Sequence, residues 1–203
     1  MRAVCSICLM VVLVAGCGPS TMEVLHLKRA NETAMLSELQ KIRVAYNVAH
    51  TEFGDYGTLM DMSDSGMLDG ALLAAWNENP GAKPIHGYFL SEIETGPDGD
   101  ELDRVHRAGL CAYPAKPGDT GDNIICITVA PGGKRPVGAG PAVFAGLPPR
   151  WSIYLARYED IGEPVTDWPN EGELQDRFRI FSQLSPEKGR TKAWEILDQV
   201  AGR

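Results

Sequence analysis

The chain has 203 residues and a formal net charge of −8. This acidic balance argues against a nucleic-acid-binding surface and against a basic patch for anionic membranes, since both need clustered Lys and Arg. The length suits a single domain with a hydrophobic core.

The first 17 residues have the layout of a bacterial export signal. Arg2 gives a positive start, Ile7 to Val14 form an apolar run, and small residues lead to Cys17. The run is shorter than the roughly 20 apolar residues that a transmembrane helix needs. The segment Val14-Ala15-Gly16-Cys17 resembles a lipobox, whose cysteine is diacylated before cleavage. An ordinary signal peptide with a coincidental cysteine and an uncleaved anchor are the alternatives.

On the lipobox interpretation, residues 1–16 are a lipoprotein signal peptide and residues 17–21 are a lipidated tether. Cys17 is then the lipidation site, and its acyl chains, palmitate among them, hold the protein stably on a membrane. Gly18 stands where an Asp would favour retention at the inner membrane. We therefore expect an outer-membrane lipoprotein that faces the periplasm or the cell surface.

Cysteine usage fits export. Cys5 and Cys8 leave with the signal peptide, and lipid occupies Cys17. Cys111 and Cys126 remain as an even pair in an oxidising compartment, which predicts one disulfide. The alternative is a pair of buried free thiols.

Residues 22–53 carry the clearest periodic pattern of the mature chain. Apolar residues recur there at alternating four- and three-residue steps, which places them on one face of a helix. They are Met35, Leu39, Ile42, Tyr46, Ala49 and Phe53. Gly54 follows, and glycine commonly ends a helix in the left-handed conformation. We expect one long amphipathic helix whose stripe, including Phe53, is core.

Short strands are expected after this helix. An irregular stretch follows Tyr56, and residues 69–76 predict a short second helix before the breaker cluster at 77–81. The strand candidates are residues 87–90, 110–113 and 124–129, and the turns between them favour antiparallel hairpins. Residues 131–149 are too rich in Gly and Pro for a regular element and are expected to form a loop.

The C-terminal third is expected to be mostly helical. Residues 151–158 fit an edge strand or a short helix equally well. Residues 171–182 and 186–201 have helical patterns, and Ser185-Pro186 fits an N-cap followed by a proline at the first helical position. We therefore expect a C-terminal helical extension over residues 170–203.

A long N-terminal helix on a small antiparallel sheet is the body plan of type IV pilins and type II secretion pseudopilins. The order of short motifs also resembles the pilin-like periplasmic domains of bacteria. These motifs are Ala30–Ala34, Leu39–Arg43, Tyr46, Phe53–Leu59, Gly66–Asp69, Gly87–Phe89, Cys111–Ala115, Gly118–Gly121 and Pro164–Pro169. The resemblance implies an α+β, pilin-like fold over residues 22–169.

The chain also departs from that family. It lacks a prepilin peptidase site and a continuous apolar helix with a Glu near its start, and the lipobox stands in their place. The segment from Thr21 to Leu27 is too short and too mixed to span a bilayer. Assembly into a pilus by the usual route is therefore not expected.

An acidic turn is the best candidate for a metal site. Asp98, Asp100, Glu101 and Asp103 fall in one short segment, and calcium prefers several carboxylate and carbonyl oxygens from a flexible loop. The full EF-hand spacing is missing. The pattern fits either a calcium site or a solvated acidic turn.

The other chemical motifs are incomplete. Ser185-Pro186-Glu187-Lys188 matches Ser-x-x-Lys, but the Ser-Asp-Asn and Lys-Thr-Gly elements of that enzyme class are missing. Gly132-Gly133-Lys134 lacks the spacing of a phosphate-binding loop. The four histidines, His26, His50, His86 and His106, have no metal-ligand spacing. We expect no catalytic residues.

The sequence thus predicts a membrane-anchored, non-enzymatic lipoprotein. Its expected role is structural or interactive, with envelope or secretion-system proteins as partners and without nucleic acid. The alternative is an ion- or ligand-binding lipoprotein that holds calcium at residues 98–103. A hydrolase that uses Ser185 ranks third.

Overall fold

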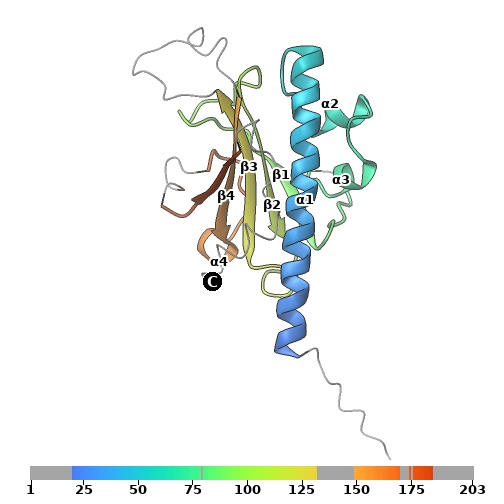
Figure 1. The fold of residues 1–203 in the computed structure, drawn as a ribbon, viewed down its shortest axis with the longest axis vertical. Helices are drawn as coiled ribbons and strands as arrows, with labels where there is room; N and C mark the ends of the chain where they lie inside the picture. Colours follow the sequence, from blue (N-terminus) through green and yellow to red (C-terminus); the bar gives the residue numbers. More distant parts are fainter. Residues whose placement is uncertain (1–19, 79, 132–148, 170–173, 175, 185–203) are drawn as a thin grey trace, which may run out of the picture.

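The protein is described by a computed structural model, which places residues 20–78, 80–131, 149–169, 174 and 176–184. It has an α+β fold in which the long helix α1 (Thr21–Phe53) lies along one face of an antiparallel sheet (Figure 1). The predicted fold class is confirmed at this level.

Both ends of α1 follow from local chemistry. The Ser20 hydroxyl accepts a hydrogen bond from the Glu23 amide, and the Glu23 carboxylate accepts one from the Ser20 amide at 2.6 Å. This capping box satisfies amides that have no partner inside the helix. At the other end Gly54 has φ 85° and its amide bonds to the His50 carbonyl. The predicted helix over 22–53 is therefore confirmed to within one residue.

The predicted apolar stripe is core for all but its last member. Its residues from Met35 to Ala49 are buried, whereas Phe53 is 61% exposed. The prediction for Phe53 is wrong because the chain turns at Gly54 and Tyr56 takes the core position. The Tyr56 ring lies edge-on to Tyr46, with 6.3 Å between the centroids.

Two short helices follow α1. The first, α2 (Leu59–Asp64), was not expected from the sequence, although Thr58 and Asp61 form a capping box at its start. The second, α3 (Gly70–Ala74), falls inside the predicted helix over 69–76.

The sheet has five antiparallel strands in the order of the sequence. They are β1 (Tyr88–Glu92), β2 (Ala108–Pro114), β3 (Asn123–Pro131), β4 (Pro149–Arg157) and β5 (Arg179–Leu184). The strands predicted at 87–90, 110–113 and 124–129 correspond to β1, β2 and β3. Residues 151–158 belong to β4 and to the start of a short helix, α4 (Tyr158–Ile161). β4 is an interior strand because β5 pairs with its other side.

The helix predicted over 171–182 is wrong where β5 forms. Residues 179–184 pair with β4, from Trp151 opposite Leu184 to Leu155 opposite Arg179. The backbone of β4 offers hydrogen bonds along a free edge, and these outweigh the weak local preference for helix. The predicted helix over 186–201 lies outside the described residues, as do residues 132–148 of the predicted loop.

Both faces of the sheet are covered. α1, α2 and α3 pack on one face, with Leu39, Tyr46 and Leu90 among the buried residues. The other face packs against α4 and the segment that contains Trp168 and Phe178. Cys111 and Cys126 are opposed on β2 and β3, are fully buried in this second core, and form the predicted disulfide.

Candidate functional site

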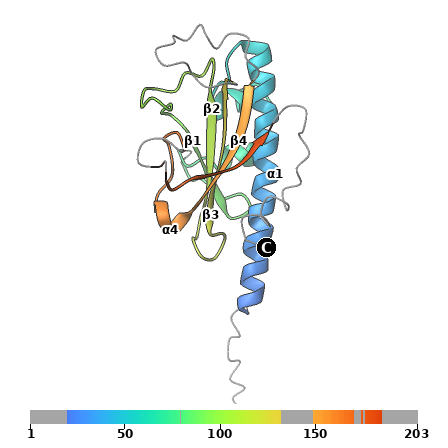
Figure 2. The same cartoon turned by 60° about the vertical axis from the view of Figure 1, so that its left-hand side comes forward.

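The features most relevant to function lie along the first third of α1. Cys17, the predicted lipidation site, is outside the described residues, and Ser20 follows it three positions later. The first turns of α1 extend beyond the sheet and its loops in both views (Figures 1 and 2). α1 thus begins close in sequence to Cys17 and runs from there onto the body of the domain.

Three large apolar side chains are exposed on this projecting part of α1. Met22 is 65%, Leu25 41% and Leu27 55% exposed. We refer to Met22, Leu25 and Leu27 as the apolar N-terminal turns. These side chains leave apolar area in water close in sequence to the predicted lipidation site, and burial of such area is favourable.

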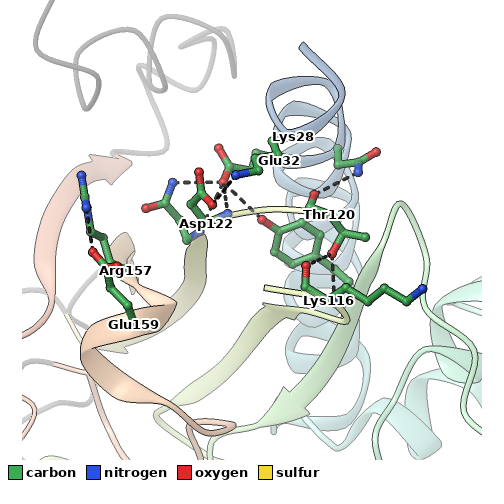
Figure 3. Close-up of polar contacts among 10 residues, drawn as sticks. Lys28, Glu32, Lys116, Thr120, Asp122, Arg157 and Glu159 are labelled. Atoms are coloured by element: carbon green, nitrogen blue, oxygen red, sulfur yellow. Dashed lines mark hydrogen bonds and ion pairs between the residues drawn. The ribbon is translucent and has the colours of Figure 1, made fainter. Parts of the chain in front are cut away.

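A buried carboxylate fixes α1 to the body just after these turns. Glu32 is 6% exposed, and its Oε1 accepts hydrogen bonds from the Asp122 amide at 3.1 Å and the Asn123 amide at 3.3 Å. The Asn123 side-chain amide donates to the same oxygen at 3.0 Å, and the Tyr88 hydroxyl donates at 3.4 Å. We call Glu32, Tyr88, Asp122 and Asn123 the Glu32 cluster (Figure 3).

Neighbouring contacts hold the same part of α1 to the loop between β2 and β3. The Lys28 ammonium lies 2.8 Å from the Asp122 carboxylate, and the Asn31 side-chain amide donates to the Thr120 carbonyl at 2.9 Å. Lys28 is therefore the point where α1 first meets the body through a polar contact, and the apolar N-terminal turns precede it.

Burial sets the electrostatics of the Glu32 cluster. Desolvation raises the pKa of Glu32 above its ordinary value of 4.5, although the hydrogen bonds from Asp122 and Asn123 oppose that rise. Desolvation, reinforced by Glu32, also raises the pKa of Tyr88, so its hydroxyl remains a donor. Burial thus disfavours the charged form of the Glu32 carboxylate, and the hydrogen bonds that it accepts partly offset this effect.

The raised pKa predicts how stability depends on pH. The native state takes up the Glu32 proton at a higher pH than the unfolded chain does. The contribution of this group is therefore complete below about pH 4.5 and is lost as pH rises through the native pKa. We expect the wild type to gain stability relative to Glu32→Gln as pH falls from 7 towards 4.5. Urea unfolding of both proteins across this range measures the difference, and a constant difference contradicts the prediction.

Close packing around the cluster predicts a second effect. A Cβ at Gly121 would overlap the hydroxyl and ring of Tyr88, which is fully buried. Gly121→Ala should therefore lower the free energy of unfolding by about 2 kcal/mol, as is usual for overpacking a core. Gly70→Ala is the control, because a Cβ there meets nothing within 4 Å. Equal thermal unfolding of the two variants would show that Tyr88 is free to move.

A second buried carboxylate, Glu92, supports α2. It is 5% exposed, its Oε1 accepts a hydrogen bond from the Leu59 amide at 3.0 Å, and the Arg104 guanidinium lies 3.6 Å away. Desolvation raises the pKa of Glu92, and Arg104 partly offsets that rise. Both buried carboxylates are thus used to hold helices in place.

The structure does not gather the predicted calcium ligands around one point. Asp98 lies 4.0 Å from the Arg107 guanidinium, and Asp103 accepts hydrogen bonds from the Val105 amide and pairs with His106. Asp100 contributes its backbone carbonyl to the Gly96 amide. The backbone of Glu101 pairs with that of Thr95 in an isolated antiparallel β-bridge. In the part of the chain that the structure describes, no group of three His, Cys, Asp or Glu residues could hold a metal ion.

The histidines are equally dispersed. His50 Nε2 lies 3.1 Å from the Val105 carbonyl, His86 is 3.5 Å from Glu38, and His106 is 2.8 Å from Asp103. His26 lies on the exposed first turns of α1. Ser185 and residues 132–134 lie outside the described residues.

Comparisons with protein-family models, with curated proteins and with solved structures found no match for the chain. Among the described residues, no helix has the length and apolar character needed to cross a membrane.

Sequence reasoning missed the two buried carboxylates. Glu32 lies three residues before Met35 and seven before Leu39, so it continues the apolar stripe, and this position is a signal that it is buried. Glu92 has no comparable signal, because its partners at Leu59 and Arg104 are distant in sequence.

Proposed function

We propose that the chain is an exported lipoprotein, anchored through Cys17, whose pilin-like domain has a structural or interaction role in envelope assembly or secretion. The observation that carries this proposal is the placement of α1. It begins four residues after Cys17, exposes apolar residues first, and then runs along an antiparallel sheet. In this arrangement α1 connects the domain directly to the lipid anchor at Cys17.

The use of the buried carboxylates supports a non-catalytic role. Glu32 accepts hydrogen bonds from backbone amides of the β2–β3 region, and Glu92 accepts one at the start of α2. A catalytic acid or base needs access to a substrate. The carboxylates of Glu32 and Glu92 are instead buried and accept hydrogen bonds from backbone amides. Glu32 and Glu92 therefore act as structural residues that hold α1 and α2 in place.

Membrane fractionation tests the anchor. Cys17→Ser should move the protein from the membrane fraction to the soluble fraction, because the acyl chains have no other attachment. Cys8→Ser is the matched control, since residue 8 belongs to the predicted signal peptide, and it should stay with membranes. A Cys17→Ser protein that remains membrane-bound, or a soluble wild type, contradicts the proposal.

The interaction role is tested against the calcium alternative. A ligand that binds only the native state raises its melting temperature. We expect the Tm of the Cys17→Ser protein to be the same with and without calcium, and deletion of the wild-type protein to impair secretion or envelope assembly. A calcium-dependent rise in Tm without a secretion defect would favour the ion-binding alternative.

A further inference from the structure

The apolar N-terminal turns are exposed in a place where the body of the domain offers no cover. Met22, Leu25 and Leu27 precede Lys28, whose ammonium makes the ion pair to Asp122. Figures 1 and 2 agree that this end of α1 extends past the sheet and the β2–β3 loop. A cover for these side chains would therefore have to come from outside the described part of the domain.

The chain between the predicted lipid and the helix is very short. Only Gly18 and Pro19 separate Cys17 from Ser20, so the tether spans at most about 10 Å. α1 then rises about 1.5 Å per residue, which places Leu27 about 10 Å beyond Ser20. The headgroup layer and the upper acyl region therefore lie within reach of these residues if the acyl chains are inserted.

The arrangement of the three side chains around α1 indicates how they meet that layer. Leu25 and Leu27 are two residues apart, so they lie on nearly opposite sides of the helix. A helix that lies flat on a membrane has one apolar side and one polar side. Apolar residues on both sides suit a helix end that enters the interface end-on.

Charge argues for apolar contact over attraction to anionic lipid. The chain is acidic overall, and Glu23 stands in the first turn of α1. Lys28 is paired with Asp122 and is therefore not free to bind lipid phosphate. Binding at this end should depend on buried apolar area and only weakly on salt.

We infer that the apolar N-terminal turns are a membrane-contact surface that immerses the start of α1 in the lipid interface beside Cys17. This inference rests on the proposed lipid anchor. It adds that the domain is held upright against the bilayer by its own helix, and it names a lipid surface as the partner of Met22, Leu25 and Leu27.

Fluorescent labelling of the lipidated protein in phosphatidylcholine vesicles tests the inference. Leu25→Cys and Leu27→Cys each provide a single labelling site, because Cys111 and Cys126 are joined in a buried disulfide and Cys17 carries lipid. Val44→Cys is the control, since Val44 is 55% exposed on the same helix and lies about 28 Å from Leu25 along its axis.

We expect an environment-sensitive dye at positions 25 and 27 to shift to shorter wavelength and to be quenched several-fold by nitroxide-labelled lipid. The dye at position 44 should show neither effect, and high salt should change none of these results. A water-exposed dye at position 25 or 27 in protein that floats with the vesicles overturns the inference alone. A blue-shifted dye without lipid quenching overturns it in favour of a protein cover, such as a second copy. Protein that fails to float overturns the lipid anchor as well.

Discussion

Replacing Cys111 and Cys126 together by alanine should lower the free energy of unfolding by about 4 kcal/mol. The disulfide closes a loop with a sequence separation of 15 residues, and a loop of that size is worth about 3 kcal/mol in the chain-entropy model. Both sulfur atoms also belong to the second core, whose packing contributes about 1 kcal/mol more. Urea unfolding of the Cys17→Ser protein with and without the double substitution measures the loss.

Reduction provides the control for the disulfide prediction. Both cysteines are fully buried, so a mild reductant should leave the native protein unchanged and should lower stability only after the chain has been unfolded. A loss of less than 1 kcal/mol in the double variant would show that the two cores hold β2 and β3 without the covalent link.

The second large effect is expected at Glu32. Glu32→Ala removes the acceptor for the amides of Asp122 and Asn123 and for the Asn123 side chain. Partly buried donors that lose their partner are costly, and we expect a loss of about 3 kcal/mol. Glu32→Gln keeps an oxygen that can accept the same hydrogen bonds, so it should recover most of the stability at neutral pH.

A matched substitution on the same helix separates this effect from the general effect of a Glu→Ala change in α1, where alanine is the better helix former. Glu52 is exposed on α1, and Glu52→Ala should stay within about 0.5 kcal/mol of the starting protein in thermal unfolding. If Glu32→Ala behaves like Glu52→Ala, the Glu32 cluster does not hold α1 to the β2–β3 loop.

The sequence was most informative where one local pattern decides the structure. The apolar stripe and Gly54 predict α1, because helical periodicity and a left-handed C-cap act within a few residues. β1, β2 and β3 and the pairing of Cys111 with Cys126 were predicted as well. In these cases the local preference and the tertiary packing agree.

The errors at β5 and at Phe53 share a different cause, which is competition from distant parts of the chain. β5 pairs with β4, although residues 171–182 suggest a helix, because the edge of β4 supplies hydrogen bonds that no local pattern contains. Phe53 leaves the core because Tyr56 occupies that space next to Tyr46 and Trp151. α2 could have been found from Thr58 and Asp61, whose capping box is local.

The candidate site was predicted only in part. The position of Cys17 before a helix follows from the sequence, but the exposure of Met22, Leu25 and Leu27 depends on where the sheet ends. The acidic turn at 98–103 looked suitable for calcium by composition, yet Asp98 and Asp103 face Arg107 and His106. Spacing in sequence does not fix where the side chains of a loop point.

The Glu32 cluster and the apolar N-terminal turns divide α1 into two parts. From Lys28 onward, α1 is held to the body by its contacts with Asp122 and Asn123 and by the core between the helices and the sheet, whereas the turns before Lys28 are exposed. Weakening the cluster should therefore loosen the domain from its proposed anchor without detaching the lipid.

The most direct test of the proposed anchor is mass spectrometry of the native N-terminus purified from membranes. We predict a mature chain that begins at Cys17 and carries acyl chains on that residue, and a Cys17→Ser protein that carries none. A mature N-terminus at another residue, or an unmodified Cys17, would contradict the lipoprotein account.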